Sequence, residues 1–223
     1  MKTSYVFKHV IGSAVFFVII FLSAGKINYW QGLVYVSIGL LMSVMSYTIL
    51  NPDPELLAER GKPGKGSKKW DKKILLSSFV VTVAMYIIAG LDSGRYHWSP
   101  DFNSSLSVTG IVFTITGQLL FVVAQKQNKF FSSTVRIQSD RNHTVCDDGL
   151  YKLVRHPAYL GSIIQAIGFP LLFGSLWSII PVVFLIVLHL IRTSMEDKTL
   201  IKELIGYSEY SRKTNYRIIP FVW

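Results

Sequence analysis

The chain has 223 residues, of which 50% are hydrophobic and 16% are charged, and its formal net charge is +10. Its mean hydropathy is +0.39. Soluble domains usually carry about a quarter charged residues, so this composition excludes an ordinary soluble domain and indicates a protein that resides in a lipid bilayer. The single cysteine, Cys146, excludes an internal disulfide and a cysteine-rich metal site.

Five stretches without a charged side chain follow one another along the sequence: residues 9–25, 27–52, 74–91, 102–125 and 156–191. A membrane-spanning helix needs roughly 17–25 apolar residues, so each of the first four stretches predicts one helix. The fifth is too long for one helix. Its middle contains Gly168-Phe169-Pro170 and Gly174-Ser175, residues typical of a turn, and it therefore predicts a helical hairpin.

The expected fold is all-α. We predict a polytopic transmembrane bundle of about six helical segments, with the last two forming the hairpin. After the last span, Leu200, Leu204, Tyr207 and Tyr210 recur at helical spacing, which predicts a cytoplasmic C-terminal amphipathic helix that packs on the bundle or on the membrane interface. The whole of 1–223 is expected to be one domain.

Nineteen of the 23 basic residues fall in three segments, 60–73, 126–155 and 192–217. With six helical segments these three lie on the same side of the membrane. The positive-inside rule places them, together with both termini, in the cytoplasm. This explains the net charge through topology and contact with lipid head groups, so no nucleic-acid partner is expected.

The first candidate for a functional site is Arg155-His156-Pro157-Ala158-Tyr159. Proline is favoured in the first turn of a helix, so Arg155 and His156 are expected at a helix N-terminus beside the membrane. Arg155 and the backbone N–H groups there could hold a carboxylate. The alternative is a structural role, in which Arg155 meets lipid head groups and His156 caps the turn.

The second candidate follows the last span, where Arg192 and Glu196 are four residues apart and share one helix face. They could pair with each other as a surface ion pair or flank a common ligand. Acidic residues gain nothing from neighbouring anionic lipids, which favours a cationic or polyhydroxylated ligand for Glu196. His143, His156 and His189 lack zinc-ligand spacing, so we predict no metal site.

At these two clusters the sequence resembles the isoprenylcysteine carboxyl methyltransferase family, and most closely its bacterial branch. The resemblance covers roughly residues 105–223. It is carried by His143-Thr144-Val145 leading to Gly149-Leu150-Tyr151, by Arg155 to Gly161, and by Glu196-Asp197-Lys198-Thr199-Leu200 with Gly206, Tyr210 and Pro220. Members of the family are membrane enzymes that use S-adenosylmethionine. The resemblance therefore implies a catalytic core at 105–223, preceded by N-terminal spans and a basic loop at 1–104.

The resemblance also implies roles for individual residues. The expected cofactor-binding residues are His143, Thr144, Val145, Cys146, Tyr151, His156, Pro157, Ala158, Tyr159 and Glu196. Arg192 is expected to bind the substrate, and Arg155 is the candidate catalytic residue. Two departures from the family pattern stand out: the second acid of the usual pair is Asp197, and an arginine, Arg136, stands where the eukaryotic pattern has an amide. Either Arg136 or Gln138 could reach the cofactor.

The expected function is S-adenosylmethionine-dependent methyl transfer to the carboxylate of a lipophilic or lipidated acceptor. A carboxylate acceptor needs alignment with the methyl group and no general base. One rival hypothesis is a phospholipid N-methyltransferase, whose amine acceptor must lose a proton. Another is a non-catalytic transporter or lipid-binding protein, which would carry polar residues along its spans.

Overall fold

A computed structural model describes residues 14–50, 55, 59–60 and 65–223. These residues form helices and connecting turns without a β-strand, so the all-α expectation is confirmed for them. The helices are Ala14–Ala24, α2 (Trp30–Leu50), α4 (Lys69–Ala89), α5 (Ser104–Gln127), α6 (Pro157–Phe173), α7 (Ile179–Glu203) and α8 (Tyr207–Lys213). The shorter elements are a π-helical turn, η1 (Gly90–Tyr96), and two 3-10 turns, η2 (Ser139–Arg141) and η3 (Gly149–Lys152).

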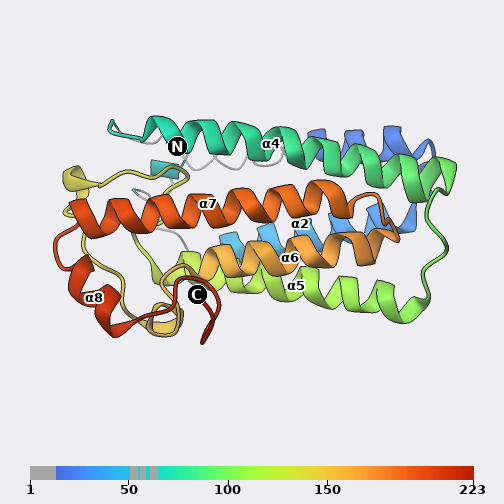
Figure 1. The fold of residues 1–223 in the computed structure, drawn as a ribbon. Helices are drawn as coiled ribbons and strands as arrows, with labels where there is room; N and C mark the ends of the chain where they lie inside the picture. Colours follow the sequence, from blue (N-terminus) through green and yellow to red (C-terminus); the bar gives the residue numbers. More distant parts are fainter. Residues whose placement is uncertain (1–13, 51–54, 56–58, 61–64) are drawn as a thin grey trace.

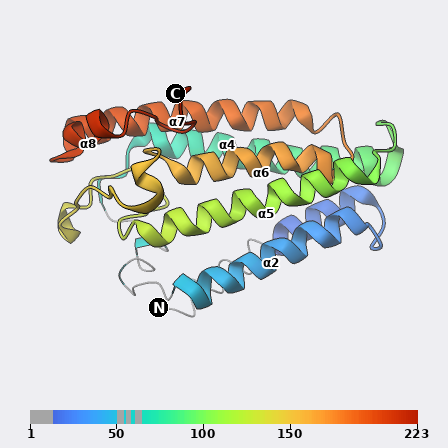
Figure 2. The same cartoon turned by 90° about the horizontal axis from the view of Figure 1, so that it is seen from below.

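The long helices run side by side along one axis, with their connections at the two ends of the bundle (Figures 1 and 2). Three of them have the length and apolarity of membrane spans: Lys69–Tyr96, Ser104–Gln127 and Ile179–Glu203. Shorter apolar helices cover Ala14–Ala24, Trp30–Ser46 and Pro157–Phe173. Each of the five charge-free stretches therefore contains helix. Residues 9–13 of the first stretch and most of the segment 51–64 lie outside the described residues.

The hairpin within 156–191 turns at the second of the two predicted turn sites, Gly174-Ser175. Helix α6 continues through Gly168 and Pro170 and ends at Phe173, where Gly174 adopts φ +65° and caps it. The turn is therefore at 174–178 and not at Gly168-Phe169-Pro170. Gly168 has a different role: a side chain there would collide with the backbone of α5 at Gly110 and Thr114.

Helices α5 and α6 make the most extensive contact in the bundle. Gly110 and Gly117 on α5 face Gly168 and Gly161 on α6, and a Cβ atom at any of them would meet backbone atoms of the other helix. Small residues let transmembrane helices approach closely, where packing and not hydrophobicity drives association. This close approach fixes the position of the α6 N-terminus, which carries Arg155 to Tyr159.

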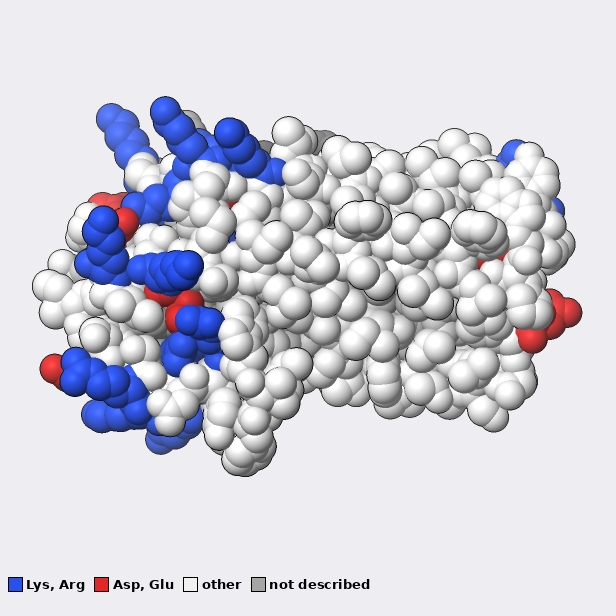
Figure 3. Space-filling model, viewed as in Figure 1, with Lys and Arg blue, Asp and Glu red and all other residues white. Residues whose placement is uncertain are grey.

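The Lys and Arg side chains gather at the end of the bundle that carries α8, and a broad uncharged band separates them from the other end on the face in Figure 3. At that other end Asp92 is fully buried. Its carboxylate accepts hydrogen bonds from the backbone N–H and hydroxyl of Ser99 at 2.7 and 2.6 Å and from the hydroxyl of Ser175 at 2.6 Å. Asp92 thus ties η1 to the α6–α7 turn.

The predicted C-terminal amphipathic helix differs from the observed one. Helix α7 ends at Glu203, Gly206 adopts φ +85°, and α8 begins anew at Tyr207, because a left-handed residue cannot continue a helix. Leu204, Tyr207 and Tyr210 are buried against Ala124, Tyr151 and Ala158. The apolar face of this segment therefore packs on the basic end of the bundle. We call residues 128–156 and 204–223, which cover that end, the cap.

The glycine contact between α5 and α6 yields a test. Gly117→Val should destabilise the protein by about 1–3 kcal/mol, because the added atoms collide with the backbone at Gly161. Gly39→Ala in α2 is the matched control, since a Cβ there meets nothing within 4 Å. Thermal unfolding in detergent measures both. Equal melting temperatures for the two variants would contradict the proposed close packing.

Candidate functional site

A cavity of about 280 Å³ at the basic end is lined by residues of the cap and of α5, α6 and α7. Its size is close to the lower end of the range for small-molecule sites. Eleven of the twelve residues singled out in the sequence line it: His143, Thr144, Val145, Cys146, Tyr151, Arg155, His156, Ala158, Tyr159, Arg192 and Glu196. Pro157 does not. It occupies the first position of α6, so its contribution is to start the helix.

The chain enters α6 through two backbone hydrogen bonds to the C-terminal tail. The N–H groups of Arg155 and His156 donate to the carbonyl oxygens of Tyr216 and Arg217 at 2.9 and 2.8 Å. We expected these N–H groups to be available to an anion. They are bonded within the protein instead, and their effect is to fix the tail beside the start of α6.

The cap is bound to α7 through Asp197, whose side chain is fully inaccessible to solvent. The guanidinium of Arg155 binds both of its oxygens at 2.8 Å. Arg217 and Tyr207 donate to it at 2.9 and 3.0 Å, and Nε2 of His156 lies 3.3 Å away. A buried carboxylate needs such partners, since an unpaired charge is costly inside a protein.

Arg155 is therefore placed differently from what a catalytic role requires. Besides the two bonds to Asp197, its Nη1 donates to the carbonyl oxygens of Thr214 and Asn215 at 2.7 and 3.0 Å. These partners direct the guanidinium into the protein. The geometry favours a role in holding the cap together over direct contact with a reacting group, and the catalytic assignment of Arg155 stays a prediction.

Arg192 and Glu196 both line the cavity but do not pair with each other. Nε of Arg192 donates to Asp71 at 2.7 Å and Nη2 to the carbonyl of Ser133 at 3.2 Å. The hydroxyl of Tyr159 donates to Glu196 at 2.6 Å, and the Arg192 guanidinium lies 5.5 Å from the centre of the Tyr159 ring. The two charged side chains thus face one cavity from one helix face, as the sequence spacing suggests, each with a different partner.

Comparison with known proteins bears directly on this arrangement. Residues 108–202 match the isoprenylcysteine carboxyl methyltransferase (ICMT) family. These residues are fewer than half of the chain and are similar to that family; we call them the ICMT-family segment. The resemblance drawn from the motifs is confirmed, and together with the three long apolar helices it makes the chain an integral membrane protein.

Three relatives illustrate the similarity. A probable protein-S-isoprenylcysteine O-methyltransferase of Oryza sativa subsp. indica is 24% identical over 52% of this chain and 62% of its own length. The protein-S-isoprenylcysteine O-methyltransferase of Saccharomyces cerevisiae is 33% identical over 52% of this chain and 49% of its own. That of Schizosaccharomyces pombe is 34% identical over 32% and 31%. The chain therefore spans less than two thirds of the length of each.

The ICMT-family segment does not contain the whole site. Asp71 and Glu59 precede it and bind Arg192 and Arg136, which line the cavity. Tyr207 and Arg217 follow it: Tyr207 lines the cavity itself, and Arg217 binds the buried Asp197 behind it. None of the four was expected in the site from the sequence, although Tyr207 was expected on the apolar face of the C-terminal helix. Asp71 is the one acidic residue in the basic tract 60–73. Its position among lysines is the sequence signal that could have indicated a specific role for it.

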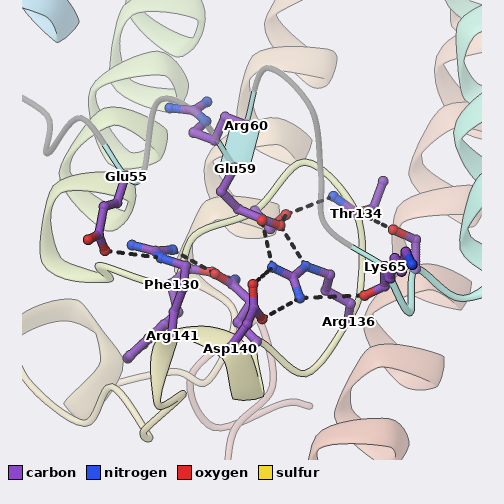
Figure 4. A network of polar contacts seen from close by, with 12 residues as sticks. Glu55, Glu59, Arg60, Lys65, Phe130, Thr134, Arg136, Asp140 and Arg141 are labelled. Carbon is purple, nitrogen blue, oxygen red and sulfur yellow. Dashed lines mark hydrogen bonds and ion pairs between the residues drawn. The ribbon is translucent and has the colours of Figure 1, made fainter. Parts of the chain in front are cut away.

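Arg136 is the departure from the eukaryotic pattern, and its surroundings explain it (Figure 4). Its guanidinium binds both oxygens of the buried Glu59, at 2.8 and 2.6 Å, and Asp140 at 2.8 Å. Gln138 donates to the carbonyl of Phe130 at 2.6 Å and accepts from Arg141 at 2.6 Å. Both Arg136 and Gln138 line the cavity, so contact of either with the cofactor stays a prediction.

The protein environment changes the titration of His143, which lines the cavity. Burial, together with the positive charges of Arg136 and Arg141, lowers the pKa of His143 from 6.5 to about 4. Its Nδ1 lies 3.3 Å from the backbone N–H of Gln138 and accepts from it. At neutral pH His143 is therefore an uncharged hydrogen-bonding group. Among the residues the structure covers, no group of three or more His, Cys, Asp or Glu side chains is arranged for a metal ion.

The depressed pKa predicts a pH effect on stability. The folded state binds a proton at His143 less readily than the unfolded chain does, so this residue makes the protein less stable as pH falls from about 6.5 towards about 4. The His143→Gln variant should lose less stability than the wild type between pH 7 and pH 5. Parallel thermal unfolding curves at the two pH values measure this, and identical pH dependence would contradict a buried neutral imidazole.

The buried ion pairs of Asp197 give a second test of stability, for which Glu203 on the same helix, α7, supplies the control. Asp197→Ala should cost about 3–5 kcal/mol of stability, because it leaves buried Arg155 without its partner. Glu203→Ala breaks the exposed bond to Lys68 at 2.7 Å and should cost less than about 1 kcal/mol. Denaturant unfolding in micelles compares the two variants, and a loss of stability for Asp197→Ala as small as that for Glu203→Ala would contradict the role of Asp197 in holding the cap on α7.

Proposed function

We propose that the chain transfers a methyl group from S-adenosylmethionine to the carboxylate of a lipophilic acceptor of the isoprenylcysteine class. The observation that carries the proposal is the single cavity that brings the motif residues of the ICMT-family segment together with Arg192 and Glu196. The names of the relatives supply the acceptor class. S-adenosylmethionine would contribute a methyl group on a sulfonium, which is already activated for transfer.

The residues of the cavity suit such a cofactor. Glu196 accepts one hydrogen bond, from Tyr159, and a carboxylate has further acceptor sites for the hydroxyl and amine donors of a nucleoside and an amino acid. The uncharged imidazole of His143 and the small side chain of Ala158 lie in the same wall. The cofactor would be held by these residues, with Thr144, Val145, Cys146, Tyr151 and His156 completing the wall.

Arg192 suits the acceptor. A carboxylate is already deprotonated at neutral pH, so the protein has only to orient it, and a positioned guanidinium does so with planar donors. Phe121, Phe131 and Leu200 give the cavity an apolar side, which suits a hydrocarbon tail entering from the membrane. The site would open to the cytoplasm, because the Lys and Arg residues gather at this end of the bundle.

We expect Glu196 and Arg192 to separate in their effects. Glu196→Gln should weaken S-adenosylmethionine binding by about 1–3 kcal/mol through the loss of a charge-assisted hydrogen bond. Arg192→Lys keeps the charge and loses the planar donor, so it should raise the KM of the acceptor and leave cofactor affinity nearly intact. Calorimetric titration and a methyl-transfer assay on protein in lipid nanodiscs measure the two effects.

The matched control is Glu203→Gln, which lies on the same helix outside the cavity lining and should leave both quantities unchanged. The acceptors compared are a farnesyl-cysteine analogue, a fatty acid and phosphatidylethanolamine. Transfer to the amine lipid alone, indifferent to Arg192→Lys, would establish a phospholipid N-methyltransferase instead. No cofactor binding by the wild type would favour the non-catalytic reading.

A further inference from the structure

Two opposite charges one helical turn apart in a shared cavity are close enough to pair. Arg192 and Glu196 are four residues apart on α7, a spacing at which oppositely charged side chains meet. Electrostatic attraction between them is stronger in a partly enclosed site than in water, because the effective dielectric constant is lower there. Nevertheless Arg192 binds Asp71 and Glu196 binds Tyr159. Something other than α7 itself must hold them apart.

Asp71 is the residue in position to do so. It is fully buried near the start of α4, outside the ICMT-family segment. Its Oδ1 accepts from Nε of Arg192 at 2.7 Å, and its Oδ2 accepts from Nη2 at 3.4 Å and from the backbone N–H of Val135 at 2.8 Å. The bond to Val135 fixes the carboxylate independently of Arg192, so Asp71 is an anchor that draws the guanidinium away from Glu196.

We propose that Asp71 is a positioning residue that keeps the charges of Arg192 and Glu196 separate, so that each remains available to a different ligand in the cavity. The identity of those ligands rests on the proposed function. Without the charge of Asp71, the largely buried guanidinium loses its ion-pair partner, and the acid one turn further along α7 replaces it. Glu196 is then neutralised by Arg192 and no longer accepts from the cofactor.

Asp71 also decides which nitrogen atom of Arg192 is left to bind the carboxylate of the methyl acceptor. Nε and Nη2 of Arg192 are directed to Asp71 and Ser133, whereas Nη1 makes no hydrogen bond to the part of the chain that the structure describes. Nη1 is therefore the atom with which Arg192 meets the acceptor carboxylate. By binding Nε and Nη2, Asp71 fixes the plane of the guanidinium and thereby the direction in which Nη1 points towards the methyl acceptor.

A suppression experiment tests the proposal. Asp71→Asn should weaken S-adenosylmethionine binding roughly tenfold, which corresponds to about 1.4 kcal/mol, although Asp71 does not line the cavity. Arg192→Gln alone should leave cofactor affinity within about twofold of wild type. The double variant Asp71→Asn/Arg192→Gln should recover near wild-type affinity, because no guanidinium remains to capture Glu196. A merely structural contact predicts a different result: loss of Asp71 leaves the Arg192 guanidinium unpaired and lowers the melting temperature, but the folded Asp71→Asn variant keeps the wild-type affinity for the cofactor.

The control is Asp92→Asn, which alters another buried acid, at the opposite end of the bundle, and should lower the melting temperature without changing cofactor affinity. Unchanged affinity in Asp71→Asn, or no recovery in the double variant, would overturn the role of Asp71. If Asp71→Asn does not fold, a folded double variant that binds cofactor supports the proposal, and a double variant that also fails to fold overturns it. Absence of binding by the wild type would instead overturn the proposed function.

Discussion

The architecture of the site depends on the burial of the Asp197 carboxylate. A charge without solvent contact must be paired, and Asp197 is paired with side chains from three places in the sequence: Arg155 before α6, Tyr207 in α8 and Arg217 in the tail. These bonds hold the cap against the end of the bundle. The walls of the cavity, from Tyr151 to Tyr159 and from Glu196 to Tyr210, are positioned as a result.

The same principle recurs around the cavity. Asp71 holds Arg192 and Glu59 holds Arg136, so each of three buried arginine pairs joins segments that are far apart in the sequence. Some of the basic residues at this end of the bundle therefore form ion pairs around the cavity, in addition to the effect of membrane topology on where basic residues lie. Because Asp71 and Glu59 precede the ICMT-family segment, the N-terminal half contributes to the site, and a division into spans at 1–104 and a core at 105–223 stays a prediction.

Much of the fold is predictable because a helix that spans the bilayer needs a long run of residues without charge. Charge-free runs of sufficient length identify the helices, and Gly174 marks the hairpin because a left-handed residue ends α6. The motifs from His143 to Tyr159 and at Glu196 predict residues that meet in one cavity. The prediction of one continuous helix through Gly206 was wrong. The apolar residues there have helical spacing, but Gly206 adopts a left-handed conformation that interrupts the helix.

The partners of these residues could not be predicted from local sequence. The pairing of Arg192 with Asp71 spans 121 residues, and nothing in either neighbourhood excludes the shorter-range pair with Glu196. Arg155 likewise reads as an anion-binding group until Asp197 and the carbonyl oxygens of the tail are placed beside it. Close contact between Gly117 and Gly161 is decided by how α5 and α6 cross, which depends on both helices at once.

The role of the cavity is tested most directly by an experimental structure with S-adenosylhomocysteine bound. We expect the ligand inside the cavity with its hydroxyl or amine groups donating to Glu196, the Arg155 guanidinium still bound to Asp197, and Arg192 still bound to Asp71. A ligand bound outside this cavity, or Arg155 released from Asp197 to contact the ligand, would show that the cavity is not the cofactor site or that Arg155 acts directly.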